Sequence, residues 1–320
     1  MSQRNIIVDA DPGIDDAVAI LYLLGCEDAN VLGITTVYGN ADIDTVTTNA
    51  LSILELAGRR VIPVAAGAVG PLNDQRPPRS PSSHGPDGLG LAPRPVPQRR
   101  AIDLDAVDLI ASMVSESPEP VSILAIAPLT NIATFCQRYP ELLPRVEDIV
   151  IMGGGFGVGN VEPAVVAEFN TWIDPEAAAI VLTSPVPTSL VPLNVTNRVM
   201  LDTAELTALP SGPVREFLTI AHAYYADARE TERGTRLTMQ HDAAAAVFLM
   251  RPELFSAVDG TVSANTGVGP HRGKTTLENR RIADRTKRTI VTDHNQTLFQ
   301  KELLSALRYL ISERAPDRHR

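Results

Sequence analysis

The sequence predicts an α/β fold, an open and mostly parallel doubly wound sheet flanked by helices. Short β-branched runs alternate with segments in which apolar residues recur at helical spacing, and this alternation is typical of parallel sheets. The runs are apolar throughout, as expected for strands that are buried on both faces. The first run, Asn5-Ile6-Ile7-Val8, leads into an Asp-Ala-Asp-Pro-Gly turn and then into a helical pattern. Strand, turn and helix in this order indicate the first unit of a doubly wound sheet.

The remaining elements follow from the same two patterns. In the first helix Ala17, Ile20, Leu21 and Leu24 repeat at helical spacing, and the second helix stops at Gly58. The predicted strands, in chain order, span residues 5–8, 31–37, 61–64, 121–126, 148–152 and 188–193. The predicted helices span residues 15–24, 44–56, 105–115, 128–137, 175–182, 214–228, 241–250 and 298–310.

Length and composition predict one domain over residues 1–320. The 320 residues are 44% hydrophobic and 21% charged, which is enough apolar material for a large core, and we find no internal repeat. The segment 71–97 differs, because it holds eight of the 25 prolines and almost no periodic apolar residues. A long segment of this kind inside a compact domain is usually functional. We therefore expect a surface loop over an active site.

Charge and hydropathy exclude several classes of protein. With 28 basic and 38 acidic residues the net charge is −10, which argues against a broad nucleic-acid-binding face. No run of 18 apolar residues predicts a membrane span, and the apolar run before Asp9 is too short for a signal peptide. Cys26 and Cys136 lie in apolar segments and are expected to be reduced core residues. We expect a cytoplasmic protein without a nucleic-acid or membrane partner.

Four carboxylates crowd the end of the first predicted strand, at Asp9, Asp11, Asp15 and Asp16. Helix capping explains one or two acids at such a place. It does not explain four, because like charges at close range resist ionisation. A hard divalent cation, Ca²⁺ or Mg²⁺, would relieve this repulsion and suits oxygen ligands. Open α/β sheets bind their ligands at the carboxyl ends of the strands, where these acids are expected to lie.

The order of residues in this cluster, Asp-Ala-Asp-Pro-Gly-Ile-Asp-Asp, resembles the N-terminal signature of the nucleoside hydrolases. Further stretches resemble the family in the same order along the chain, up to about residue 250. They are Thr35-Thr36-Val37-Tyr38-Gly39-Asn40, His84-Gly85-Pro86-Asp87-Gly88-Leu89, Pro128-Leu129-Thr130-Asn131, Met152-Gly153-Gly154, Glu168 to Ala177, and His241-Asp242. Two positions depart from the family pattern: Ala127 replaces a glycine and Ala243 replaces a proline.

The resemblance implies hydrolysis of the N-glycosidic bond of a ribonucleoside to free base and ribose. It implies one Ca²⁺ held by the carboxylates of Asp11, Asp16 and Asp242 and by the backbone carbonyl of Thr130. Asp11 would act as the general base on the Ca²⁺-bound water, with Asn40 helping to hold the water or a hydroxyl. Asp9 would orient the turn rather than touch the metal. The expected assembly is a homodimer or a homotetramer.

The resemblance also implies a substrate site. Asp15 and Asn170 would grip ribose hydroxyls, and Asn160 and Glu168 would bind the 5′ side of the sugar. Phe169 and Met152 would shape the ribose floor. Residues expected on the nucleobase side are His84, Tyr225, Arg229, Arg233 and His241, of which His241 is the proposed proton donor to the leaving base and His84 the second choice.

Other interpretations remain open at this point. His241 could simply cap the helix that it begins, and the two arginines could form a solvated face. The Asp9-x-Asp11 spacing also occurs in haloacid-dehalogenase-type phosphatases, in which Asp9 would be the nucleophile and phosphate would be released. A nucleoside-binding protein without turnover is the third possibility.

Overall fold

The structure, a computed structural model, describes residues 3–73, 83–161, 166–233, 237–278 and 288–313, and in the last turns before residue 234 it describes the backbone alone. Its strands are β1 (Arg4–Ala10), β2 (Ala29–Thr36), β3 (Val64–Ala66), β4 (Val121–Ala125), β5 (Val146–Met152), β6 (Thr188–Val191), β7 (Met200–Asp202), β8 (Leu237–Met239), β9 (Phe255–Ala264), β10 (Thr275–Glu278) and β11 (Arg288–His294). Its α-helices are α1 (Ile14–Gly25), α2 (Ile43–Leu56), α3 (Ala106–Glu116), α4 (Thr130–Arg138), α5 (Phe169–Ile173), α6 (Pro175–Thr183), α7 (Leu193–Thr196), α8 (Thr203–Thr207), α9 (Pro213–Arg233), α10 (His241–Met250) and α11 (Gln296–Glu313).

Most of the strands join one large sheet with the order β10-β9-β11-β6-β5-β4-β1-β2-β3. The neighbours from β11 to β3 pair in parallel, whereas β9 is antiparallel to both β11 and β10. The strands β7 and β8 form a separate antiparallel pair. This architecture confirms the predicted mostly parallel, doubly wound sheet.

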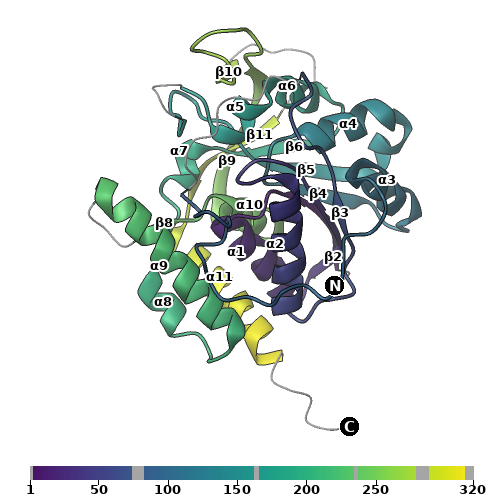
Figure 1. Ribbon diagram of the computed structural model, residues 1–320. Helices are drawn as coiled ribbons and strands as arrows, with labels where there is room; N and C mark the ends of the chain where they lie inside the picture. The colour runs from purple at the N-terminus through teal and green to yellow at the C-terminus, as the bar shows by residue number, and fades with distance from the viewer. Residues whose placement is uncertain (1–2, 74–82, 162–165, 234–236, 279–287, 314–320) are drawn as a thin grey trace.

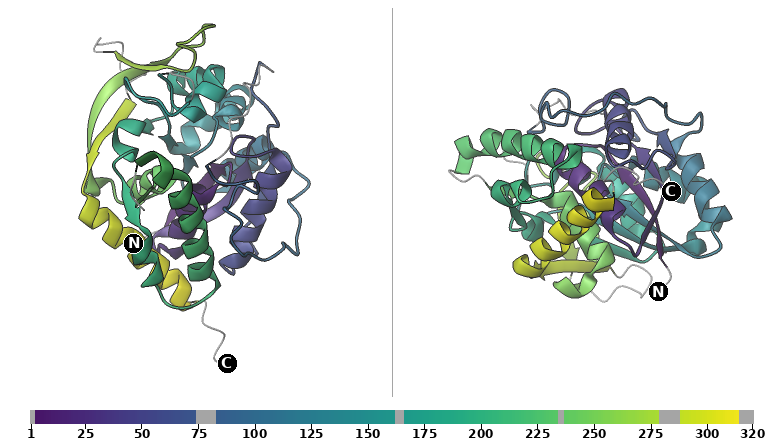
Figure 2. Two further views of the ribbon diagram at one scale, coloured as in Figure 1. Left: turned by 60° about the vertical axis from the view of Figure 1, so that its left-hand side comes forward. Right: turned by 90° about the horizontal axis from the view of Figure 1, so that it is seen from below.

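Helices cover both faces of the sheet (Figure 1), because β1 sends apolar side chains to both sides. Ile6 and Val8 pack into a core with α1, α2, α9, α10 and α11. Ile7 packs into a second core with α3, α4 and α6. In Figure 2 the long β9 curves away from the parallel strands at the far end of the sheet. None of the described helices is long and apolar enough to cross a membrane.

The strand order reverses at β1, and this reversal positions the site. The chain passes from β1 to β2 and β3 on one side, then crosses back to β4 on the other side. The connections therefore diverge from the carboxyl ends of β1 and β4, where open α/β sheets bind their ligands. Asp9 is the penultimate residue of β1 and pairs with Ala125 of β4, and Asp11 is the first residue after β1.

Several predicted boundaries were wrong. The strand expected at 61–64 begins only at Val64, and the Val61 side chain is 92% exposed. The strand expected at 188–193 ends at Val191, because Leu193 already begins α7. The patterns predicted no strand at β9, whose residues are mostly exposed and include Asp259 and Gly260. An exposed polar strand lacks the apolar run that marks the parallel strands.

The proline-rich segment is ordered where it is described. Residues 74–82 lie outside the described residues. In the following turn the Asp87 carboxylate accepts hydrogen bonds from the backbone N–H groups of Leu89 and Leu91 and pairs with Arg94 at 2.7 Å. Asn49 of α2 donates from its amide nitrogen to the carbonyls of both Pro12 and Asp87. The turn is therefore tied to the loop after β1. Both cysteines are buried and free of a disulfide.

Candidate active site

The loop between β1 and α1 wraps around the carboxylate of Asp16. Asp16 Oδ2 accepts the backbone N–H of Gly13 at 2.8 Å, and Oδ1 accepts that of Asp11 at 3.3 Å. Asp15 and Asp16 occupy the first turn of α1, where the helix dipole favours negative charge. Local capping therefore orients the acidic stretch toward the end of the sheet.

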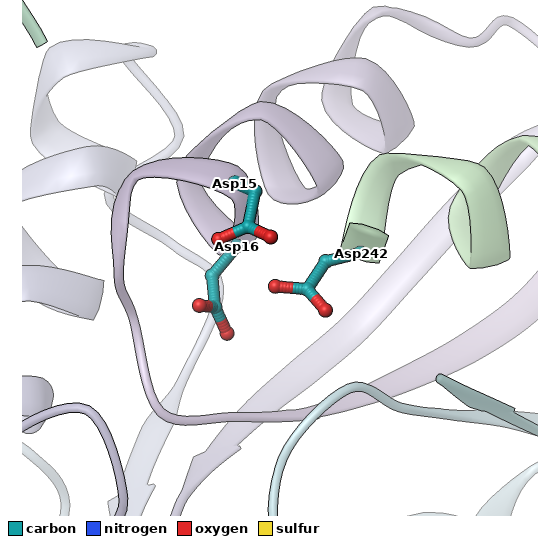
Figure 3. A group of neighbouring side chains, drawn as sticks. All are labelled: Asp15, Asp16 and Asp242. Atoms are coloured by element: carbon teal, nitrogen blue, oxygen red, sulfur yellow. The ribbon is translucent and has the colours of Figure 1, made fainter. Parts of the chain in front are cut away.

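Asp242 joins these acids from the opposite end of the sequence. It lies in the first turn of α10, which packs against α1. One carboxylate oxygen from each of Asp15, Asp16 and Asp242 lies within 4.8 Å of the others, and all three residues are buried. Figure 3 shows the three carboxylates pointing toward one another from the starts of the two helices.

The ionisation of this cluster is strongly disfavoured. Burial and the charge of Asp15 raise the pKa of Asp16 to about 7. Burial, followed by the charges of Asp16 and Asp15, raises the pKa of Asp11 well above its ordinary value of 3.8. The pKa of Asp242 is raised in the same way by burial and then by the three other acids. Among the described residues, no salt bridge joins these carboxylates to lysine or arginine.

Asn40, at the carboxyl end of β2, holds Asp11. Its backbone N–H donates to Asp11 Oδ2 at 2.6 Å, and its amide nitrogen donates to the Asp11 carbonyl and to Asp16 Oδ2, both at 3.2 Å. Gly39 leaves room for this contact, because a Cβ there would collide with the Asp11 carboxylate. Asn40 thus fixes the orientation of Asp11.

Asp9 faces a different set of neighbours. Its Oδ1 accepts from the Thr35 hydroxyl at 2.6 Å and from the Asn131 amide at 2.8 Å, and the residue is fully buried. Burial raises the pKa of Asp9 to about 7. Asn131 also donates to the Thr36 carbonyl, so it links β1, β2 and α4. The sequence reasoning quoted Thr35 and Asn131 within motifs but gave them no role.

The residues expected on the ribose side gather around α5. Asn170 is buried and donates to the carbonyls of Met152 at 3.2 Å and Ile126 at 3.4 Å. Glu168 caps α5: its oxygens accept the N–H groups of Gly154, Asn170 and Thr171. Burial raises the pKa of Glu168 to about 7, against the lowering effect of these donors.

Two residues of this group lie at its edge. Asn160 is exposed, and its side-chain oxygen accepts the backbone N–H of Phe169 at 2.8 Å. Phe169 itself is half-buried against the small cluster that includes Tyr38 and Ile173. In this structure Asn160 therefore supports the start of α5.

Among the residues expected on the nucleobase side, His84 reaches the acidic cluster. Its Nδ1 accepts the backbone N–H of Ile14 at 3.1 Å and lies 3.8 Å from Asp15 Oδ1. The His84 ring stacks on Tyr225, with ring centroids 5.4 Å apart. Arg229 and Arg233 belong to the end of α9, and their side chains lie outside the described residues.

His241 is buried at the start of α10, with Nδ1 2.8 Å from the Thr196 hydroxyl. A further histidine, His222, which no sequence motif indicated, contacts the residue before His241. His222 is fully buried, with Nδ1 against the Leu218 carbonyl and Nε2 3.2 Å from the amide nitrogen of Gln240, the residue before His241. Burial lowers the pKa of His222 to about 4, so it is neutral. His222 lies in the middle of an ordinary amphipathic helical stretch, so no motif in the sequence marks it as a site residue.

Thr130 differs from the expectation that it offers a carbonyl to a metal. Its carbonyl accepts the Thr134 hydroxyl at 2.7 Å within α4, and its hydroxyl donates to Asp174 at 2.7 Å. Ile126 directly follows β4; its N–H donates to the Asp9 carbonyl, and its own carbonyl accepts from Asn170. A carbonyl ligand carries no side-chain signature, so residue types alone do not reveal it.

Comparison with known proteins matches this arrangement over nearly the whole chain. A sequence model described as inosine-uridine preferring nucleoside hydrolase matches residues 6–301. A pyrimidine-specific ribonucleoside hydrolase RihA of Shewanella baltica is 37% identical over 294 residues, covering 90% of this chain and 91% of its own. A probable uridine nucleosidase 1 of Oryza sativa subsp. japonica is 37% identical, and the match covers 82% of this chain and 81% of that protein.

Solved structures agree with the sequence comparison. A plant nucleoside hydrolase superposes with a TM-score of 0.88 at 32% identity, covering 95% of this chain and 98% of that one. A purine-preferring ribonucleoside hydrolase from Gardnerella vaginalis gives a TM-score of 0.88 at 29% identity, covering 96% and 99%. The acids at the reversal of the sheet thus lie in a shared fold, and the chain belongs to the inosine-uridine preferring nucleoside hydrolase family, enzymes that hydrolyse the N-glycosidic bond of ribonucleosides.

Proposed function

We propose that the enzyme binds one Ca²⁺ through the carboxylates of Asp11, Asp16 and Asp242 and uses Asp11 as the general base on the attacking water. The observation that carries this proposal is the buried group of Asp15, Asp16 and Asp242, whose oxygens lie within 4.8 Å of one another. Ca²⁺ binds oxygens at about 2.3–2.6 Å, so two ligands of one ion lie at most about 5 Å apart. The spacing of Asp15, Asp16 and Asp242 therefore fits a shared ion and supports Asp16 and Asp242 as ligands. Asp11 lies next to this group, because Asn40 donates to both Asp11 and Asp16.

The chemistry of the donors also fits. All four acids offer hard oxygen atoms, and burial together with mutual repulsion raises the pKa values of Asp11, Asp16 and Asp242. A cation removes this penalty by neutralising the charge. For the backbone ligand we propose the Ile126 carbonyl in place of Thr130, since the Thr130 carbonyl accepts the Thr134 hydroxyl at 2.7 Å whereas the Ile126 carbonyl accepts only a long hydrogen bond from Asn170, at 3.4 Å, among the described contacts.

The side chains divide the remaining work. Asn40 holds Asp11 through two hydrogen bonds, so that the base stays aimed at the site. Asp15 and Asn170 are proposed to bind ribose hydroxyls, and Glu168 to set the position of Asn170 from the 5′ side. Loss of the base leaves positive charge on the ribose, which nearby carboxylates stabilise. When bound, Ca²⁺ supplies charge that makes the attacking water more acidic.

The leaving base needs a proton, and His241 is the proposed donor. It is held by Thr196 next to Asp242, while His84 stacks on Tyr225 at the same site. The nearby His222 stays neutral through burial and serves as a fixed support for Gln240. Arg229 and Arg233 remain proposed nucleobase residues.

The experiment compares two adjacent carboxylates. Asp16→Asn should abolish Ca²⁺ binding measured by titration calorimetry, together with turnover. Asp15→Asn should keep Ca²⁺ affinity within about tenfold and lose turnover, because it removes a ribose contact rather than a ligand. If Asp15→Asn loses Ca²⁺ as fully as Asp16→Asn, Asp15 is itself a ligand and the assignment is wrong. Retained turnover in Asp16→Asn contradicts the calcium proposal as a whole.

We further propose uridine as a substrate, since the similar proteins from Shewanella and rice are named for pyrimidine nucleosides and uridine. A panel of uridine, cytidine, inosine and guanosine, assayed for reducing sugar, tests this preference. The kcat/KM for the matched 2′-deoxyuridine should be lower than that for uridine by a factor of order 10⁴, because buried groups that bind the hydroxyl would be left unpaired. Equal efficiency on both would contradict the ribose site.

The other expectations from the resemblance stay predictions. They concern a homodimer or homotetramer and a cytoplasmic location. A light-scattering measurement of the mass in solution tests the first of them.

A further inference from the structure

The loop between β9 and β10 lies against α5, the short helix that carries Asn170. Figures 1 and 2 show this hairpin at the end of the sheet beside α5 and α6. The loop is remote in sequence from α5 and belongs to the antiparallel extension that the sequence did not predict. Its contacts are numerous for an exposed hairpin.

Gly273 makes the closest approach. The Thr171 hydroxyl donates to the Gly273 carbonyl at 3.1 Å. A Cβ at Gly273 would collide with the Trp172 backbone, and its φ of +76° is a left-handed conformation. Only glycine therefore allows the loop to lie directly on α5.

The residue at the start of β10, Thr275, contacts the turn at Gly154 and Gly155. Thr275 is buried, and its hydroxyl accepts the Gly155 N–H at 2.9 Å. The neighbouring Gly154 N–H donates to Glu168, the cap of α5. Arg272 reaches α6 in a bidentate pair with Glu176, at 2.8 and 2.6 Å. The loop thus contacts α5, the turn below it and the helix after it.

We propose that the β9–β10 hairpin, through Gly273 of its loop and Thr275 at the start of β10, is a positioning element for the ribose side of the site. The hairpin packs against α5 and against the turn at Gly154 and Gly155, and these contacts keep the Asn170 amide in hydrogen-bond contact with the Met152 carbonyl. The inference rests on the proposed ribose role of Asn170. Neither loop residue touches the acidic cluster in the described contacts, so the calcium proposal can fail or hold independently.

A matched pair of glycines in this loop provides the test. Gly269 also has a left-handed φ, +104°, but a Cβ there meets nothing within 4 Å. Gly273→Ala and Gly269→Ala therefore share the backbone strain, and only the first drives a methyl group into α5. Gly273→Ala should lower kcat/KM for a ribonucleoside by on the order of tenfold to a hundredfold, mainly through KM, as misplaced binding groups do. Gly269→Ala should stay within about twofold of the wild type, well below the effect of such a misplacement.

Trp172 is the only tryptophan of the chain, so its fluorescence reports on α5 directly. Gly273→Ala should shift the emission maximum and Gly269→Ala should not, while calorimetric Ca²⁺ affinity stays unchanged in both. Thr275→Val and Thr275→Ser form a second pair. Valine removes the acceptor for the Gly155 N–H and should mimic Gly273→Ala, whereas serine restores the acceptor and the activity. This pair decides the matter if Gly273→Ala does not fold.

A double-mutant cycle separates positioning from general loss of stability. If the loop acts through Asn170, Gly273→Ala should cost much less in the Asn170→Ala background than in the wild type. Equal kcat/KM and emission for the two glycine variants, or effects that multiply fully with Asn170→Ala, would overturn the inference. An Asn170→Ala variant with wild-type KM would overturn it as well, because nothing would remain for the loop to position.

Discussion

Two groups of buried carboxylates lie at the carboxyl ends of the parallel strands, and they differ in the groups that compensate their negative charge. Glu168 has three backbone N–H donors, from Gly154, Asn170 and Thr171. Asp242 is surrounded instead by the charges of Asp15, Asp16 and Asp11, each of which raises its pKa. Burial is almost complete for both residues, at 1% and 5% exposure. Burial alone therefore does not distinguish a structural acid from a metal-binding one.

The difference lies in the surrounding dipoles. A buried charge is tolerated when hydrogen-bond donors or an opposite charge compensate its lost hydration. Glu168 obtains part of this compensation from three backbone N–H groups, which lower its pKa although burial still raises it to about 7, and it caps α5 without a ligand. Asp16 and Asp11 accept hydrogen bonds from the loop and from Asn40, but burial and mutual repulsion still raise the pKa values of Asp11, Asp16 and Asp242, and the proposed cation would supply the missing compensation. Removing the charge should consequently have opposite effects on stability at the two places.

Asp242→Asn should give the largest effect. We expect a loss of turnover on the order of 10³-fold, the range for removing a strong electrostatic contact in a site. The metal-free variant should nevertheless melt higher than the metal-free wild type, because one of four mutually repelling acids is gone. Calcium should raise the melting temperature of the wild type and not of the variant. A metal-free variant that melts lower would contradict the picture of uncompensated charge.

His241→Ala tests the group next to this acid. General acid catalysis contributes about 10²–10⁴-fold, so natural nucleosides should slow by about 10²-fold or more. A p-nitrophenyl riboside, whose leaving group needs no proton, should be hardly affected. Equal losses on both substrates would make His241 a binding or structural residue. If neither rate falls, His84, Arg229 or Arg233 is the next donor to examine.

The contrast also shows which parts of the site a sequence can reveal. The crowding of Asp11, Asp15 and Asp16 is visible because side-chain identity carries the chemistry. The role of Glu168 as a cap depends on backbone N–H groups that only the fold brings together. The Ile126 carbonyl and the contact of Gly273 with α5 are likewise backbone features. The alternation of apolar runs predicted the parallel strands β1 to β6 but missed β11, which pairs in parallel with β6. The strands β9 and β10 were also missed, because few of their residues are buried.

Glu168→Gln should show the opposite sign from Asp242→Asn. The amide NH₂ of glutamine would face backbone N–H donors, and an unsatisfied buried donor costs about 1–3 kcal/mol. We therefore expect a lower melting temperature, by roughly 2–4 °C per kcal/mol for a protein of similar size. Urea unfolding of the metal-free protein measures the change. The matched control is Glu176→Gln, in the partly exposed pair with Arg272, where the loss should be smaller.

The smallest expected effect is the pH dependence of the metal-free protein. Burial raises the pKa of Asp16 from 3.8 to about 7 and also raises the pKa values of Asp9 and Glu168 to about 7, so between the ordinary and the raised values the folded chain binds more protons than the unfolded chain. Stability must then fall as pH rises through this window, and it is greatest below it. We expect the melting temperature of the calcium-free enzyme to decline by roughly a few degrees between pH 5 and pH 8.

Saturating calcium should oppose this trend, because the ion binds the deprotonated carboxylates and competes with protons. The stabilisation by calcium, measured as the difference in melting temperature with and without the ion, should therefore increase from pH 5 to pH 8. Asp242→Asn should flatten the metal-free decline, since the remaining acids repel one another less. Glu168→Gln should leave the difference between the calcium-bound and calcium-free curves intact, because Glu168 is compensated by the backbone. Parallel curves with and without calcium in the wild type would show that the acidic cluster does not hold the ion.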